Sequence, residues 1–395
     1  MPTHIGIGFS QNPNSSLAAR EAATKAKIQT QQPTVDCALV FHTIHYHPAE
    51  VLESIREILG EAKLIGATTA GVILSESIEM RAVAVLAITS SDLYFGCGGV
   101  PEGMSGDIRQ AGNLLARRAM MDLGPHPRQG FVCFTDGLLK NSSPIIQGLQ
   151  EIFGTVFPIG GAGASDDFHF RKTYQYCQDK VMTSDACGLL IGGHGNFVIT
   201  GRHGLRPLGK PRIADRVDGH IIKTIDGKKP YSLYEEFLGN EAAGLRSKTL
   251  SPMAILYPLG ILLEEEKEYL VRNAVDILND GSIVCQGEVP EGAEVHIMMS
   301  SKDSLIQAAR DCATEIREAF KGKTPQAVVI FESLARYKLL GQAAFKEILM
   351  IKEILGNTTP LLGMYSYGEI APFHSPGPLK KIHLQHQSIV LWAIG

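Results

Sequence analysis

The sequence contains no run of basic residues and no apolar stretch long enough to cross a membrane. Its 395 residues include 37 Lys and Arg against 41 Asp and Glu, a formal charge of −4 at pH 7. Nucleic-acid binding normally needs a clustered basic surface, so we expect no nucleic-acid partner. A membrane-spanning helix needs about 20 consecutive apolar residues. The first residues also lack the basic start and apolar core of a signal peptide, so we expect a cytoplasmic protein with no membrane partner.

Paired cysteines and the common catalytic motifs are missing as well. The seven cysteines are widely spaced without a C-x-x-C pair, and most lie within apolar runs, which is typical of buried thiols in a reducing compartment. His42, His45 and His47 cluster, but no Cys or acidic residue stands beside them at metal-ligand spacing. The phosphate-binding G-x-x-x-x-G-K-[ST] loop, the G-x-S-x-G elbow and the H-E-x-x-H helix are also absent. We therefore expect no metal and no cofactor, and we assign no catalytic residue.

Three glycine-rich segments, at residues 66–71, 160–167 and 363–369, stand out in what the sequence does contain. Each follows a predicted strand, helix and strand. The first glycine lies 25 and 26 positions after an aromatic residue of the first strand in two of them, and 32 positions after one in the third, where a longer helix accounts for the difference. Such an internal repeat constrains the fold more than local propensity does. We predict repeated strand-helix-strand units, with helices at residues 48–59, 144–153 and 341–355.

The ratio of strands to helices predicts a layered fold. Each unit has one long helix for about four strands, so helices alone cannot cover both faces of a sheet. We predict a mixed α/β (α+β) sandwich in which mixed sheets pack face to face with helices outside. With 44% hydrophobic and 20% charged residues, a chain of this length is expected to form two domains. A turn-rich junction at residues 226–230 suggests domains at 1–225 and 226–395, and residues 258–300 are a candidate for a degenerate fourth copy.

The third glycine-rich segment carries the richest chemistry. Tyr365 and Tyr367 offer flat apolar surface with a polar tip, and Glu369 after Gly368 could hold an amine. Arg336 follows an apolar strand and could hold a ligand carboxylate in bidentate fashion. The alternative is a tight turn between strands, in which Arg336 pairs with Glu369 for structural reasons.

The first two glycine-rich segments add further candidates. Thr68 and Thr69 could line a pocket or simply form a turn. Gly161 could expose a backbone amide to a ligand, and Asp166 could contribute a carboxylate, although neighbouring aspartates make a phosphate an improbable ligand here. The alternative is that these loops pack closely against a sheet.

Several segments, in this order, resemble the FIST family, in which FIST N and FIST C domains are paired. The resemblance covers nearly the whole chain, although Ser333 and His386 stand where family members often have Cys and Asn. The matching segments are residues 65–71, 160–166 with 173–174, 270–273, 289–292, 331–336, 363–370 and 386–388.

The resemblance implies a sensory module of signal transduction that binds a small ligand such as an amino acid, and no established catalytic activity. Because the sequence shows no kinase, methyl-acceptor, cyclase or DNA-binding segment, we expect a separate signalling protein as partner. Two alternatives stay open: a metabolic enzyme that uses Asp136, Arg336 and Glu369 as acid, base and anchor, and a protein-assembly module. The sequence also leaves a homo-oligomer open.

Overall fold

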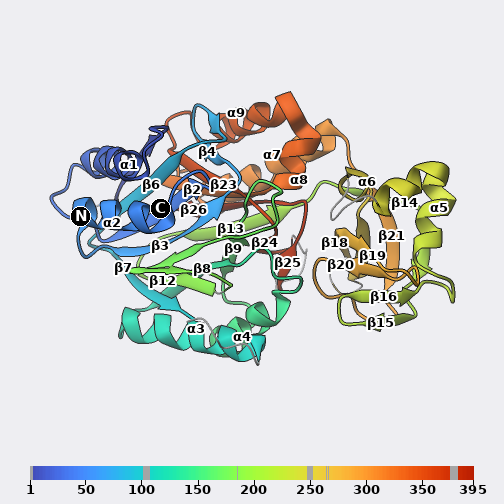
Figure 1. Cartoon of the computed structure of the whole chain (residues 1–395). Helices are drawn as coiled ribbons and strands as arrows, with labels where there is room; N and C mark the ends of the chain where they lie inside the picture. Colours follow the sequence, from blue (N-terminus) through green and yellow to red (C-terminus); the bar gives the residue numbers. More distant parts are fainter. Residues whose placement is uncertain are drawn as a thin grey trace.

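The structure, a computed structural model, describes residues 3–100, 107–184, 186–246, 252–263, 265, 267–373 and 381–395. Figure 1 shows a larger body and a smaller domain at one end of it. The body contains three six-stranded sheets, and the small domain, residues 206–299, contains two four-stranded sheets. Within the described residues, no helix is long and apolar enough to span a membrane.

The first sheet of the body has the order β1-β6-β2-β3-β10-β11. Its central strands β2 and β3 are parallel, and β2 also pairs antiparallel with β6. Helices α1 and α2 pack on its outer face. The elements are β1 (His4–Ser10), α1 (Ser15–Thr30), β2 (Cys37–Thr43), α2 (Pro48–Leu59), β3 (Lys63–Thr69), β6 (Val83–Thr89), β10 (Gln175–Cys177) and β11 (Lys180–Met182).

The second sheet has the order β25-β24-β9-β8-β12-β7 and again pairs two central strands, β8 and β9, in parallel. Helices α3 and α4 cover its outer face. The elements are β7 (Leu93–Gly99), α3 (Ile108–Leu123), β8 (Arg128–Thr135), α4 (Ser143–Phe153), β9 (Ile159–Gly163), β12 (Ala186–Gly193), β24 (Glu369–Pro372) and β25 (Ile382–Gln385).

The third sheet follows the same plan, with the order β13-β26-β22-β23-β4-β5 and a parallel pair β22 and β23. Helices α7 and α9 cover its outer face. The elements are β4 (Val72–Leu74), β5 (Ile78–Glu79), β13 (Phe197–Arg202), α7 (Lys302–Ala319), β22 (Ala327–Ser333), α8 (Leu334–Leu340), η2 (Gly341–Ala343), α9 (Ala344–Leu355), β23 (Leu361–Ser366) and β26 (Ile389–Ile394).

A hairpin passes from each unit into the sheet of another. The hairpin β4–β5 follows the first glycine-rich segment but joins the third sheet, where β4 pairs with β23. In the same way β10–β11 joins the first sheet and β24–β25 joins the second. Because the chain crosses between sheets directly after each glycine-rich segment, the three segments are brought to the same region of the body.

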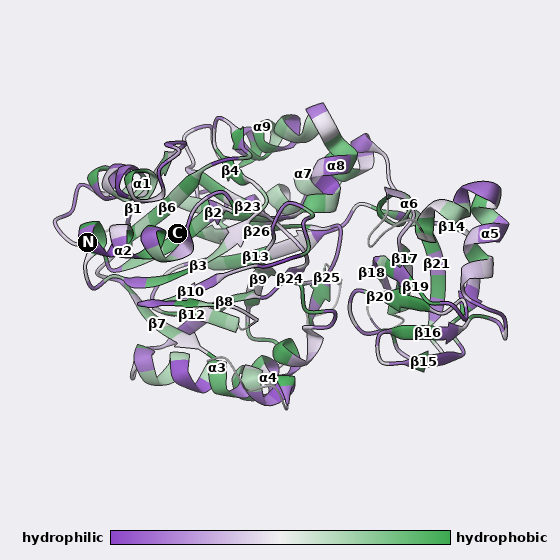
Figure 2. Cartoon of the chain, in the orientation of Figure 1, coloured by the Kyte–Doolittle hydropathy of each residue, from purple (hydrophilic) through white to green (hydrophobic). Residues whose placement is uncertain are grey.

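The inner faces of the three sheets share one hydrophobic core. Phe41, Phe134 and Phe331 come from the three central strands, and their rings meet edge to face at 5.5 and 5.7 Å between centroids. Figure 2 shows largely hydrophobic central strands, whereas the helices mix hydrophobic and hydrophilic residues. The predicted mixed α/β sandwich with helices outside is confirmed. All seven cysteines are free and buried, as expected from their apolar surroundings.

The small domain leaves the body after β13 and returns to it at α7. The described part of residues 258–300 forms strands β17 to β21 and no helix, so it does not show the strand-helix-strand plan of the body. The boundary proposed between residues 225 and 226 lies after β16, and it stays a prediction. The elements are β14 (Arg206–Ile213), β15 (Arg216–Asp218), β16 (Ile221–Thr224), α5 (Tyr231–Leu238), η1 (Gly239–Arg246), α6 (Pro252–Leu256), β17 (Leu259–Leu263), β18 (Glu268–Arg272), β19 (Ala274–Ile277), β20 (Ile283–Cys285) and β21 (Glu294–Met299).

Asn14 caps the first helix, and its removal gives a test of the local structure. Its side chain accepts a hydrogen bond from the backbone N–H of Leu17 at 2.9 Å. Replacing Asn14 with alanine leaves that amide without its partner, so we expect a loss of about 1 kcal/mol in the free energy of unfolding. Urea denaturation measures the loss. An unchanged midpoint for Asn14→Ala, or an equal loss for the conservative Asn14→Asp, would contradict the role of the cap.

Candidate functional site

The three glycine-rich segments meet at one place, here called the loop junction, formed by residues 68–71, 163–166 and 365–369. The hydroxyl of Ser165 donates to the carbonyl oxygen of Tyr365 at 2.5 Å and accepts from the backbone N–H of Ala70 at 2.9 Å. Thr69 also donates to the carbonyl of Tyr365, at 2.9 Å. One serine therefore links all three segments, although the sequence analysis did not select it.

Close backbone packing explains a glycine in each segment. Gly66, Gly161 and Gly363 lie opposite the preceding parallel strand, where a Cβ atom would collide with a backbone carbonyl. Gly161 also has φ of 145°, a conformation that favours glycine. The packing alternative accounts for these glycines, and a ligand-binding role for Gly161 stays a prediction.

Asp166 organises an extra loop of the second segment. Its carboxylate accepts backbone N–H bonds from Phe170 at 3.0 Å and Arg171 at 2.7 Å, and it accepts the hydroxyl of Tyr367 at 2.7 Å. Asp167, Phe168 and Phe170 have positive φ values of 54°, 59° and 50°. Such conformations are costly for bulky side chains and persist only where the surroundings enforce them.

The strained loop packs its aromatic side chains beneath the small domain. Phe170 stacks on Tyr367 at 5.1 Å between ring centroids, and Phe168 lies 6.1 Å from the same ring. Both phenylalanines also contact the hydrophobic core of the small domain. Tyr367 of the loop junction thus packs against aromatic side chains that also contact the small domain.

Glu369 is fully buried and bonded to serines. Ser366 donates to one carboxylate oxygen at 2.6 Å, and the hydroxyl of Ser388 donates to the other at 2.8 Å. Burial raises the pKa of Glu369 to about 7, and the serine hydrogen bonds only partly oppose this shift. Glu369 therefore changes its charge near neutral pH.

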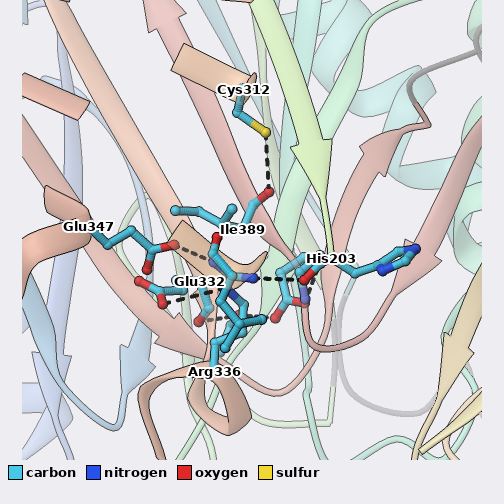
Figure 3. Close-up of polar contacts among 10 residues, drawn as sticks. His203, Cys312, Glu332, Arg336, Glu347 and Ile389 are labelled. Atoms are coloured by element: carbon cyan, nitrogen blue, oxygen red, sulfur yellow. Dashed lines mark hydrogen bonds and ion pairs between the residues drawn. The ribbon is translucent and has the colours of Figure 1, made fainter. Parts of the chain in front are cut away.

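Arg336 lies in a buried ionic cluster, shown in Figure 3. Its guanidinium pairs with Glu347 and lies 3.6 Å from Glu332, and it donates to the carbonyl oxygens of His203 at 2.8 Å and Leu305 at 3.1 Å. His203 precedes the small domain in sequence and Leu305 follows it. Arg336 thus joins the two connections of the small domain, and its ion pairs are with Glu332 and Glu347.

The carboxylate of Glu332 is the weakly compensated member of this cluster. It is fully buried, and neither of its oxygens has a hydrogen-bond partner within the described part of the chain. Burial and the neighbouring Glu347 raise the pKa of Glu332 well above its usual value, while Arg336 opposes the shift. Arg336 was a candidate from the sequence and the two glutamates were not. Only the fold brings Glu347 of α9 against the end of β22, where Glu332 and Arg336 lie.

A chain of hydrogen-bonded side chains runs from Gln387, between β25 and β26 of the body, through the small domain to the loop junction. Gln387 donates to the side chain of Asn273 at 2.8 Å, and Asn273 donates to Gln286 at 3.1 Å. Gln286 in turn donates to the carbonyl oxygen of Tyr367 at 2.5 Å. Gln387 is fully buried with φ of 56°. This polar chain connects the small domain to the body through residues that the sequence analysis did not assign to a site.

Buried polar atoms on one residue of the loop junction and on two residues beside it lack partners among the described residues. They are the hydroxyl of Tyr365, Nε2 of His386 and Oε1 of Gln387. Buried polar groups are normally hydrogen-bonded, so each unsatisfied group indicates a missing partner such as water or a ligand. The predicted residues Thr68, Thr69, Asp166, Tyr365, Tyr367 and Glu369 are all buried around this junction.

A cavity of about 520 Å³ opens between the body and the small domain, here called the interdomain cleft. Helix α4 and strand β25 form its wall on the body, and residues 270–272 and 288–291 lie opposite. A second cavity, of about 600 Å³, lies beside the connections to the small domain. The residues selected from the sequence line neither cavity, and their ligand-binding roles stay predictions.

The remaining candidates, Asp136 and His42, form hydrogen bonds with single neighbouring side chains. Asp136 accepts the hydroxyl of Thr173 at 2.6 Å, and His42 Nε2 lies 2.5 Å from the hydroxyl of Tyr176. Burial lowers the pKa of His42 to about 4, so it is neutral at pH 7. In the part of the chain that the structure describes, no group of acidic, His and Cys side chains could hold a metal ion.

Comparisons with known proteins agree with the order of the sequence segments. A family model for the FIST N domain matches residues 36–228, and one for the FIST C domain matches residues 230–372. Proteins of Mycobacterium tuberculosis and Mycobacterium bovis, both described as uncharacterized, are 23% identical over 379 and 387 residues, 93% of this chain and 94% of each relative. A structure titled as a cyanuic acid hydrolase from A. caulinodans covers 99% of both chains at 8% identity, with a TM-score of 0.39, too low for any inference.

Proposed function

The chain belongs to the FIST family, whose domains are associated with ligand binding in signal transduction, and we propose that it is a cytoplasmic sensor of an amino acid or similar zwitterionic metabolite. The metabolite binds at the loop junction, and the signal passes to a separate protein. The observation that carries this proposal is a set of buried polar atoms without partners among the described residues: the hydroxyl of Tyr365 in the loop junction, and atoms of His386 and Gln387 beside it. A zwitterion supplies both donors and acceptors for such atoms.

The position of the junction suggests how binding is transmitted. Tyr367 touches the strained loop of the body through Asp166 and Phe170, and it receives a hydrogen bond from Gln286 of the small domain. A ligand that orders Tyr365 and Tyr367 therefore changes the contacts between the two parts of the molecule. The shift it can cause is limited by its difference in affinity for the two arrangements.

A thermal-shift screen against amino acids and organic acids tests the proposal. A ligand present at about one hundred times its Kd stabilises the folded state by about 2.7 kcal/mol, which raises the Tm measurably. Tyr365→Phe removes one unpartnered hydroxyl and is expected to reduce the shift. Tyr46→Phe is the control, because it makes the same chemical change in the layer that covers the outer face of the first sheet. The ligand-induced rise in Tm should be unchanged in this variant.

The outcomes separate the proposal from its alternatives. Stabilisation by a metabolite without turnover supports the sensor. Product formation that is lost in Glu369→Gln supports the enzyme instead, and the absence of any small-molecule response together with a co-purifying protein supports the assembly module. If the ligand raises the Tm of Tyr365→Phe and Tyr46→Phe equally, the loop junction is not the binding site.

A further inference from the structure

Two arginines are almost fully buried, and they differ in how their charge is neutralised. Arg336 faces the carboxylates of Glu332 and Glu347. Arg272, which is 2% exposed, donates to the backbone carbonyl oxygens of Glu288 at 2.9 Å, Leu384 at 2.9 Å and Val271 at 3.1 Å. Among the described residues, Arg272 forms no ion pair. Backbone carbonyl dipoles hold this buried cation, and the exposed carboxylate of Glu288 attracts it without forming an ion pair.

An isolated buried charge is unfavourable, and a nearby anion relieves it. Burial lowers the pKa of Arg272 to about 10, so the guanidinium stays protonated at pH 7. His386 lies 3.4 Å from Arg272 and cannot supply the negative charge. Burial and Arg272 lower the pKa of His386 to about 3, so its ring is neutral at pH 7. The position therefore has a standing preference for an external anion.

Arg272 also has a free edge at a cavity. Its hydrogen bonds within the described residues use Nε and Nη1, which leaves Nη2 available, and Arg272 lines the interdomain cleft. The lining of the cleft combines apolar side chains, including Ile146 of α4, Val289 and Leu384, with the charged side chains of Glu288, Glu291 and Lys381. A volume of about 520 Å³ is within the range of small-molecule sites, which are mostly apolar with a few placed polar groups.

We propose that the interdomain cleft binds a small organic carboxylate with an apolar body, whose carboxylate pairs with Arg272. This rests on the proposed sensory function and specifies the anionic part of its ligand. The cleft adjoins the loop junction. Leu384 and His386 both contact Arg272, and their side chains also lie next to Gly368 of the junction. Two segments that resemble the FIST family, residues 270–273 and 289–292, form its wall on the small domain.

The cleft also provides a reason for a conformational response. One wall belongs to α4 and β25 of the body, and the other belongs to the small domain. A carboxylate held by Arg272, with its apolar part against Ile146, contacts both parts at once. Such a ligand binds more tightly when the walls are close, and this difference in affinity favours the closed arrangement.

The test uses isothermal titration of the full chain with phenylacetate, octanoate and phenylalanine, and with neutral phenylacetamide. At least one carboxylate is expected to bind, and phenylacetamide to bind about tenfold more weakly than phenylacetate or not at all. Gln147 is exposed on α4 and lines the cleft, so Gln147→Trp should weaken binding by about tenfold through steric filling. Gln307→Trp is the matched control, an exposed helix position that lines the other cavity.

Arg272→Gln removes the charge and should abolish the preference for carboxylate over amide. If this variant fails to fold, Gln147→Trp against Gln307→Trp still decides the question. The inference is overturned if none of the three carboxylates binds, if the amide binds as well as phenylacetate, or if Gln147→Trp retains full affinity. Metabolite binding that is lost in Tyr365→Phe but unchanged in Gln147→Trp would overturn the cleft while leaving the proposed function intact.

Discussion

Replacing Arg336 with leucine is expected to lower the free energy of unfolding by about 3–5 kcal/mol. The substitution leaves the buried carboxylates of Glu332 and Glu347 facing each other without their cation. It also removes the hydrogen bonds to the carbonyl oxygens of His203 and Leu305, which lie on the two connections to the small domain. Urea denaturation followed by circular dichroism measures the loss.

A surface arginine provides the control for this prediction. Arg109 pairs with Glu151, and its side chain is 54% exposed. Arg109→Leu should therefore change the denaturation midpoint only slightly, because exposed ion pairs contribute little. Adding Glu347→Leu to Arg336→Leu should recover part of the loss, since it removes one of the uncompensated carboxylates. A loss below 1 kcal/mol for Arg336→Leu would show that the cluster is neutralised in another way.

Raising the pH from about 4.5 to 7 is expected to reduce the contribution of Glu369 to stability by on the order of 3 kcal/mol. Burial raises its pKa from 4.5 to about 7 in the folded protein. Below pH 4.5 the carboxyl is protonated in both states. As the pH rises, the unfolded chain loses this proton first and is stabilised relative to the folded protein, until the folded-state carboxyl also ionises.

Glu369→Gln isolates this contribution, because glutamine cannot ionise. The difference in unfolding free energy between the variant and the wild-type protein should shift in favour of the variant between pH 5 and pH 8. At pH 5 this difference already includes the effect of the altered hydrogen bonds to Ser366 and Ser388. Only the change of the difference with pH therefore reports the ionisation of Glu369. A difference that stays constant across this range would mean that Glu369 titrates as an ordinary glutamate.

The local elements and the fold class could be predicted from the sequence. The apolar periodicity of residues 48–59 and 144–153 marks helices α2 and α4, because each helix buries one face against a sheet. Asn14 caps α1, and asparagine is among the residue types favoured at that position. The glycine-rich segments were recognisable because a parallel strand approaches Gly66, Gly161 and Gly363 too closely for a side chain. These features depend on neighbouring residues and on backbone sterics.

Long-range pairing could not be read in the same way. The sequence analysis offered Glu369 as a structural partner of Arg336, but the fold places Glu347 and Glu332 against Arg336 and serines against Glu369. Similarly, the sequence makes residues 258–300 a candidate for a degenerate fourth copy, and their described part forms strands of the small domain. The sequence indicates that a buried charged residue needs an oppositely charged or hydrogen-bonding partner, but it does not identify that partner.

The sequence by itself determined the strand and helix units, their glycine-rich ends and the layered α/β class, because periodicity and steric demand act over a few residues. Only the tertiary structure decided that the hairpins β4–β5, β10–β11 and β24–β25 cross into other sheets. That crossing gathers the three loops and places β25 against Arg272 of the small domain. A strand's pattern specifies which face it buries, whereas its neighbour is chosen by the packing of the whole chain.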